Sequence, residues 1–346
     1  QGGRVGPRPA DRFRDAENFA VPQSRGGRVR RLGNWERDLA FIDIGRQPRG
    51  KANLPSGWDS GDSKVTQKII LYGLFGNPVG HSLSPVMDNA AYQAMGLPAK
   101  YLPFQVSNAE EALRRIRDME IRGASVTLPF KTAMMAHLDG VDGDSRVIGA
   151  VNTVRVQEGK IWGTNTDWIG SNRSLKQHLD IRAKTFAVMG SSGAARAAVF
   201  GIKKEGGNPI ILYRNPETGK ALARDFDCPC RPLSDLGDTG AHCLINATPV
   251  GMAPDAASTL ARKGDLARFK WVMDMVYNPL ETSLLKEAKA AGCGVITGLP
   301  MLVFQGAEQI RIWTGREPPV EWMAKVAEEE LLRRGSDTRR TGKGNG

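Results

Sequence analysis

Histidine and cysteine are scarce in this chain. Among its 346 residues there are only four histidines and four cysteines. Cys228 and Cys230 flank a proline, while Cys243 and Cys293 stand alone. A tetrahedral zinc site needs four ligands, and no cluster of histidines or carboxylates accompanies the Cys-Pro-Cys motif. We therefore expect no metal site, and we expect the thiols to be kept reduced in a cytoplasmic compartment.

Long apolar runs are also missing. No stretch approaches the roughly 18 uninterrupted apolar residues that a membrane span requires, so we expect no membrane partner. The start of the chain lacks the charged-then-apolar pattern of a secretory signal. Hydrophobic residues nevertheless make up 40% of the sequence, which is enough for substantial cores. At roughly 100–200 residues per domain, the length favours two domains.

The positive charge is concentrated at the two ends. The formal net charge is +11; residues 1–66 hold 13 Lys and Arg against 8 Asp and Glu, and residues 333–346 hold 5 against 1. We expect 1–66 to be a disordered basic extension and 333–346 a disordered basic tail. Because the body between them is nearly neutral, we expect no nucleic-acid partner, although a nucleic-acid-binding arm at 1–66 remains an alternative.

Apolar runs alternate with helical patterns from about residue 67 onward. Strands are expected at 69–75, 101–106, 123–128, 185–189, 209–213, 243–247 and 271–275. Helices are expected at 84–95, with Ser84 as the cap, at 109–119, after residue 131, and at 194–204. This alternation predicts an α/β protein with two α/β units and a cleft between them.

A short glycine-containing segment is a candidate cofactor loop. It consists of Gly190, Ser191, Ser192, Gly193 and Ala194. It follows a strand and opens a helix, so small residues would let a pyrophosphate approach the free N–H groups of the helix. Ser192 and Ala195 replace the later glycines of the usual G-x-G-x-x-G motif, so an ordinary strand-to-helix turn remains possible.

The end of the next expected strand indicates which dinucleotide would bind. An NAD enzyme usually has Asp or Glu here for the ribose 2′-hydroxyl. This chain has Arg214, whose guanidinium can hold a 2′-phosphate, and Lys220 could add a second charge. The pattern favours NADP(H), although Arg214 could equally be a solvated loop charge.

Polar residues that suit substrate chemistry precede this loop in three clusters. Ser82 and Ser84 stand at a helix entrance, where two hydroxyls can clamp a carboxylate. Lys131 follows a strand end, where it could pass a proton to a substrate. Asp167 could pair with Lys131, and Asn152 could bind a polyol. Each cluster also has a simpler interpretation, respectively a helix cap, a solvated lysine and turn chemistry.

Taken in order, these clusters resemble the shikimate dehydrogenase family over about residues 67–332. Further family features follow at residues 246–248, 275–277 and 298–305. The resemblance implies a substrate-binding domain at 67–168, joined by returning helices at 305–332, and a Rossmann-type NADP-binding domain at 169–304. It also implies the reversible NADPH-dependent reduction of 3-dehydroshikimate to shikimate, in the biosynthesis of aromatic amino acids.

The resemblance assigns roles residue by residue. Lys131 would be the proton donor and acceptor, with Asp167 as its partner. The residues implied in substrate binding are Ser82, Ser84, Thr127, Asn152, Asp167, Tyr277 and Gln305. Those implied in cofactor binding are Gly190, Ser191, Ser192, Gly193, Ala194, Arg214, Lys220, Met275 and Gly298. Met275 and Gly298 would flank the nicotinamide.

The sequence departs from the usual family pattern at a few positions. Ser125 stands where many bacterial members have asparagine, residues 190–193 read G-S-S-G rather than G-A-G-G, and 213–215 read Y-R-N rather than N-R-T. These changes leave two alternatives open, an NAD-linked quinate/shikimate dehydrogenase and a non-catalytic NADP-binding relative. Monomer and homodimer are both compatible with the sequence.

Overall fold

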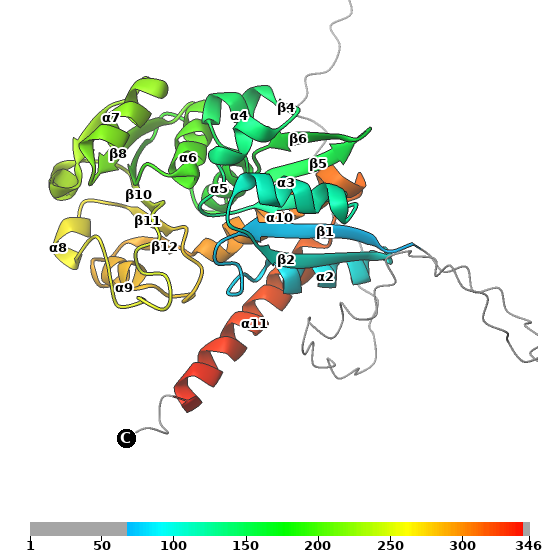
Figure 1. Cartoon of the computed structure of the whole chain (residues 1–346). Helices are drawn as coiled ribbons and strands as arrows, with labels where there is room; N and C mark the ends of the chain where they lie inside the picture. The colour runs from blue at the N-terminus through cyan, green and yellow to red at the C-terminus, as the bar shows by residue number, and fades with distance from the viewer. Residues whose placement is uncertain (1–67, 342–346) are drawn as a thin grey trace, which may run out of the picture. The chain divides into compact units, whose positions relative to one another are not determined.

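The structure, a computed structural model, describes residues 68–341, with side chains as far as residue 335. The predictions made for residues 1–66 and 342–346 lie outside this part of the chain. Two sheets organise the described residues, and both belong to one structural unit of the chain. The predicted α/β class with two α/β units is confirmed (Figure 1).

The first sheet is mainly parallel at one side and antiparallel at the other. Its strand order is β2-β1-β3-β5-β6-β4. The strands are β1 (Ile70–Gly76), β2 (Ala99–Gln105), β3 (Gly123–Val126), β4 (Gly140–Val141), β5 (Thr153–Gln157) and β6 (Lys160–Thr164). β1 pairs in parallel with β2 and β3, whereas β5 joins β3 and β6 in antiparallel pairs. Every residue of β1 after the first is buried, as expected for a central strand covered on both faces.

Helices flank this sheet and end close to the predicted positions. They are α2 (Ser84–Ala94), α3 (Ala109–Asp118), the 3₁₀ segment η2 (Ala133–His137) and α4 (Gly143–Ile148). The prediction that Ser84 caps its helix is wrong, because Leu83 occupies the N-cap position. The Ser82 hydroxyl instead accepts a hydrogen bond from the Ser84 N–H at 3.2 Å. The expected helix after residue 131 is only the 3₁₀ turn η2.

The second sheet is parallel throughout, in the order β12-β11-β10-β7-β8-β9. Its strands are β7 (Thr185–Met189), β8 (Asn208–Tyr213), β9 (Cys230–Pro232), β10 (Cys243–Asn246), β11 (Trp271–Asp274) and β12 (Gly294–Ile296). Its connections are α6 (Gly193–Lys204), α7 (Pro216–Asp225), η3 (Leu233–Asp238), α8 (Lys263–Leu266) and α9 (Ser283–Ala290). The order reverses at β7, which is the switch point where Rossmann-type sheets bind dinucleotides.

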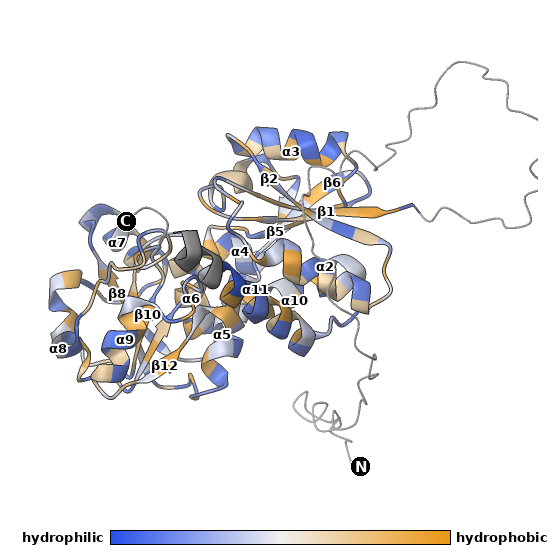
Figure 2. Ribbon diagram, turned by 90° about the horizontal axis from the view of Figure 1, so that it is seen from below, coloured by the Kyte–Doolittle hydropathy of each residue, from blue (hydrophilic) through white to orange (hydrophobic). Residues whose placement is uncertain are grey.

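Two helices carry the chain between the sheets. α5 (Asp167–Lys176) leads from β6 to β7, and α10 (Gly298–Thr314) leads back from β12; the two helices pack against each other. Figure 2 shows apolar residues along the strands and polar residues on the outer turns of α3. The returning segment was expected to begin at residue 305, but α10 is continuous from Gly298. The proposed domain boundary at 304 therefore falls inside a helix.

The final helix is longer than predicted. α11 (Val320–Thr341) packs on α2 and α10, so the prediction of a disordered tail from residue 333 is wrong as far as residue 341. Met323, Ala327 and Leu331 are buried at helical spacing and anchor this helix. Charged residues in the following turn pair with Glu330 and continue the helix beyond the apolar anchor.

Candidate active site

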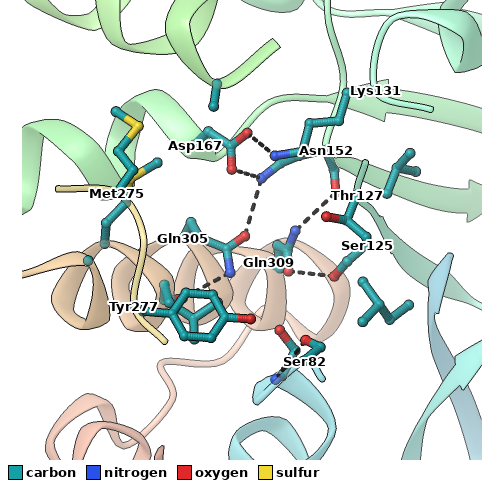
Figure 3. Close-up of a pocket in the computed structure, with 17 residues that line it drawn as sticks. Ser82, Ser125, Thr127, Lys131, Asn152, Asp167, Met275, Tyr277, Gln305 and Gln309 are labelled. Carbon is teal, nitrogen blue, oxygen red and sulfur yellow. Dashed lines mark hydrogen bonds and ion pairs between the residues drawn. The ribbon is translucent and has the colours of Figure 1, made fainter. Parts of the chain in front are cut away.

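The carboxyl ends of the first sheet face a cavity of about 170 Å³ (Figure 3). All the residues predicted to be catalytic or substrate-binding line it: Ser82, Ser84, Thr127, Lys131, Asn152, Asp167, Tyr277 and Gln305. Ala194, Met275 and Gly298 line the same cavity from the second sheet's side. The structure therefore brings together residues that are spread over more than 220 positions of the sequence.

Lys131 and Asp167 form an ion pair in the wall of this cavity. The Lys131 Nζ lies 2.5 Å from Asp167 Oδ2, and the two side chains are 16% and 5% exposed. Asp167 is the first residue of α5, so its side chain lies at the positive end of the helix dipole. Its N–H is bound by the Asn165 side chain at 2.9 Å, which fixes the start of the helix. The ion pair thus joins the loop that follows β3 to the first turn of α5.

Asn152 holds the carboxylate from the other side. Its Nδ2 donates to Asp167 Oδ1 at 2.8 Å and lies 3.0 Å from Thr166 Oγ1 and 3.2 Å from Gln305 Oε1. An amide has two hydrogens, so these three acceptors exceed what it can satisfy at once. A hydroxyl-bearing ligand entering the cavity could therefore take over one of these interactions without leaving a buried group unpaired.

Ser82 and Ser84, together called the serine clamp, lie at the far side of the cavity from the ion pair. Ser84 is 6% exposed in the first turn of α2, and Ser82 precedes it in the loop from β1. Tyr277 lies beside them: burial raises the pKa of its phenol, and hydrogen bonds with Ser82 and the Leu83 backbone oppose that rise. Two hydroxyls, a phenol and a helix N-terminus converge here, which suits a carboxylate.

Two residues of this site were not among the predicted ligands. The Ser125 hydroxyl accepts from the Tyr101 phenol at 2.6 Å and donates to Gln309 Oε1 at 2.7 Å. The Gln309 amide then donates to Thr153 Oγ1 at 2.9 Å. Gln309 follows Gln305 by four residues, so both amides face the same side of α10. Two glutamines at that spacing in a mainly apolar helix were a signal that sequence analysis could have used.

The predicted cofactor loop has a shape that fits a pyrophosphate. Gly190 has a φ of +114°, and a Cβ there would lie 3.0 Å from Thr248 Cγ2. Ser192 is the N-cap of α6, but its hydroxyl donates to Ala247 O rather than capping the helix. The first N–H groups of α6, including that of Gly193, consequently lack intrahelical acceptors and can bind an anion.

Arg214 and Lys220, the two residues predicted to hold the 2′-phosphate, lie in different surroundings. Arg214 is exposed just beyond β8, and no ion pair involves it within the described part of the chain. Thr218 of α7 contacts the loop, with its hydroxyl 2.9 Å from that of Ser191. Lys220 lies about 200° further round the helix and lines a different hollow beside Cys228. The structure therefore places the Thr218 hydroxyl next to the cofactor loop, and the role of Lys220 in holding the 2′-phosphate stays a prediction.

A buried carboxylate shapes the turn that carries Met275 and Tyr277. Asp274 Oδ1 accepts from Asn246 Nδ2 at 2.9 Å and from the Val276 N–H at 3.0 Å, while Oδ2 accepts from Thr282 at 2.6 Å. Burial raises the pKa of Asp274 to about 6. The carboxylate ties the end of β11 to the end of β10, and so sets the position of both predicted ligands.

Three further features bear on the class of site. No described helix has the length and apolar character needed to cross a membrane. Between residues 68 and 341 there is no group of three or more histidines, cysteines or carboxylates arranged to bind a metal ion. All four cysteines are free thiols.

Two family models match parts of this chain. The model described as "Shikimate dehydrogenase substrate binding domain" matches residues 74–154, and "Shikimate 5′-dehydrogenase C-terminal domain" matches residues 298–328. A curated relative from Pyrococcus abyssi, named shikimate dehydrogenase (NADP(+)), is 39% identical over 263 residues, which cover 75% of this chain and 98% of the relative.

Solved structures agree with these matches. A crystal structure of a shikimate dehydrogenase in complex with NADP+ is 38% identical, has a TM-score of 0.73, and aligns with 76% of this chain and 96% of its own. The Thermus thermophilus shikimate 5-dehydrogenase, solved in complex with NADP(H) and shikimate, is 36% identical with a TM-score of 0.70. That alignment covers 75% of this chain and 99% of the neighbour.

Proposed function

This chain belongs to the shikimate dehydrogenase family, and we propose that it catalyses the reversible NADPH-dependent reduction of 3-dehydroshikimate to shikimate. The observation that carries the proposal is the Lys131–Asp167 ion pair, which lies in one cavity with a carboxylate clamp and with residues from the cofactor side. The family's curated members are named for this activity, and an NADP(H) and shikimate complex is known for one neighbour.

The carboxylate end and the ketone end of the substrate contact different walls of the cavity. Ser82 and Ser84 bind the carboxylate, assisted by the N-terminus of α2. Thr127, Asn152 and Gln305 contact the ring oxygens, while Tyr277 covers the ring beside the clamp. This places the ketone next to Lys131, because the ion pair and the clamp lie on opposite walls of one cavity (Figure 3).

The cofactor fits the edge of the second sheet. Gly190–Ala194 hold the pyrophosphate at the start of α6, and Arg214 with Thr218 holds the 2′-phosphate. Met275 and Gly298 flank the nicotinamide, at the positions where they line the cavity. When bound, NADPH supplies the hydride that reduces the ketone carbon.

The protein contributes a proton and an orientation. The Lys131 ammonium donates a hydrogen bond to the ketone oxygen, stabilises the developing negative charge and delivers the proton to it. Asp167 holds the ammonium in place, and Asn152 holds Asp167. In the reverse direction Lys131 takes the hydroxyl proton. Because the cavity has walls from both sheets, it also brings donor and acceptor together.

The proposal is tested by following NADPH absorbance with 3-dehydroshikimate, and its formation with shikimate. Quinate and NADH are the matched alternatives. Oxidation of shikimate with NADP+, at an efficiency well above that with NAD+, supports the proposal. If quinate is oxidised with NAD+ as efficiently as shikimate is with NADP+, the chain is the NAD-linked quinate/shikimate dehydrogenase. Binding of NADPH without any turnover would indicate a non-catalytic relative.

We also propose a cytoplasmic location and a monomeric or homodimeric state. The four free thiols support a reducing compartment. Light scattering of the purified chain measures its oligomeric state directly, and fractionation of the producing cell measures its location.

A further inference from the structure

We propose that Arg334, in the C-terminal helix, is a positioning residue for the substrate carboxylate, because it holds the backbone of the Ser82 loop from outside the cavity. This inference rests on the proposed function. It gives a role at the site to a residue beyond the limits of the sequence resemblance, in a segment that the sequence predicted to be disordered.

Two hydrogen bonds connect α11 to the loop. The Arg334 guanidinium donates to His81 O at 2.7 Å through Nη1 and to Ser82 O at 3.4 Å through Nη2. Both carbonyls belong to the loop between β1 and α2, three and two residues before Ser84. A guanidinium is rigid and planar, so two donors from one group restrain the orientation of two successive peptide units.

The guanidinium is itself fixed in place. Its Nε donates to Glu330 Oε1 at 2.8 Å, one turn earlier in the same helix. Glu330 is only 14% exposed and also accepts two hydrogen bonds from Arg333. Leu331, the residue after Glu330, is buried in a hydrophobic cluster that includes residues of α2. Helix, carboxylate and guanidinium therefore form a rigid bracket against the loop.

The charge of Arg334 also reaches groups at the site. It lowers the pKa of His81, in addition to the effect of burial, and it opposes the rise in the pKa of Tyr277. Tyr277 lines the cavity beside Ser82, so the Arg334 charge acts on a group next to the position proposed for the carboxylate. Substrate binding should accordingly depend on Arg334 both for loop geometry and for charge.

Arg333 provides a matched control. It is adjacent, carries the same charge and binds the same Glu330, and its Nε is 2.8 Å from Glu330 Oε2. Its side chain is 59% exposed and donates to Glu330 of the same helix. Removing Arg333 tests the effect of losing one helix cation, whereas removing Arg334 also releases the loop. In either variant Glu330 keeps one arginine partner.

The experiment measures KM and kcat for shikimate in the full-length wild type, Arg334→Ala and Arg333→Ala. We expect Arg334→Ala to raise KM about 10-fold or more, as for loss of a charge-assisted interaction, with kcat within about threefold. Arg333→Ala should stay within about twofold of wild type. The methyl ester of shikimate, which lacks the charge, should lose less from Arg334→Ala than shikimate does. Equal KM values in the two variants would overturn the proposal, and so would an equal loss with acid and ester.

A second measurement does not depend on activity. Amide hydrogen exchange of residues 79–84 should accelerate in Arg334→Ala and stay unchanged in Arg333→Ala, with equal melting temperatures showing that both variants fold. If the wild type fails to oxidise shikimate, the proposed function is wrong, and exchange still decides whether Arg334 fixes the loop. Unchanged exchange in Arg334→Ala would refute the bracket whatever the activity.

Discussion

Removal of the Lys131 ammonium gives the sharpest test of the proposed chemistry. In Lys131→Ala the ketone oxygen loses its proton donor, while the serine clamp and the cofactor loop, which are built from other segments, stay intact. Positioned general acid–base catalysis contributes about 10²–10⁴-fold, or about 3–5 kcal/mol of barrier. We therefore expect kcat to fall by that factor, and KM for shikimate to stay within about tenfold.

The same substitution has a cost in stability that must be separated from the catalytic loss. Asp167 is 5% exposed and would lose its cation, although Asn152 still donates to it at 2.8 Å. Breaking a buried pair from one side typically costs about 3–5 kcal/mol, and the partial exposure of Lys131 reduces that figure. The double variant Lys131→Ala with Asp167→Asn removes the uncompensated charge, so its melting temperature should recover.

The assay is steady-state NADP+ reduction with shikimate, with melting temperatures for both variants and with methylamine added to Lys131→Ala. Activity should stay low in the double variant despite its recovered stability. A small primary amine can take the hydroxyl proton and should restore part of the lost rate in the single variant. An undiminished kcat in Lys131→Ala, or a loss confined to KM, would refute the role of Lys131 in proton transfer.

Three further predictions concern other parts of the molecule. Arg214→Ala should raise KM for NADPH about 10- to 100-fold and leave KM for NADH nearly unchanged, because only NADPH carries the 2′-phosphate; equal effects on both cofactors would contradict this role. Since burial raises the pKa of Asp274 from 3.8 to about 6, the folded state binds the proton more tightly, and stability should fall as pH rises from about 4 to 6. Urea unfolding should show Asp274→Asn gaining up to about 3 kcal/mol relative to wild type over that pH range, and a pH-independent difference would argue against it. Gly298→Ala would place a Cβ 2.6 Å from the backbone oxygen of Met275, so kcat/KM should drop roughly 10- to 100-fold, whereas Gly264→Ala meets no atom within 4 Å and should be neutral.

Much of the fold was predictable because its elements have local signals. The apolar run at β1 and the small residues before α6 identify a strand and a strand-to-helix turn without tertiary information. The end of the chain was less predictable. The charge-rich sequence after Leu331 indicates disorder when considered alone, whereas the structure stabilises it by packing α11 on α2 and by pairing Glu330 with two arginines.

The site was predictable where residue type and family order agree, and less so where it depends on which way a helix faces. Lys131 and Asp167 could be paired from the sequence, although neither is informative alone. Lys220 was assigned by its charge and stays a prediction, whereas the contact of Thr218 with the loop depends on which way α7 faces and was not predicted. Gln309 was missed because its role depends on contacts with Ser125 and Thr153, which are distant in the sequence.

The two passages of the chain between the sheets have a consequence for how the enzyme can move. The helix of one passage begins at Asp167, the first residue of α5, and that of the other begins at Gly298, the first residue of α10. We expect a rotation of one sheet relative to the other to bend the backbone at the ends of these helices. The carboxylate that pairs with Lys131 and the glycine that lines the cavity lie at two of those ends, so opening of the cleft to release product should also disturb the catalytic arrangement. Closure around both ligands would restore it, which ties the reactive geometry to the presence of substrate and cofactor together.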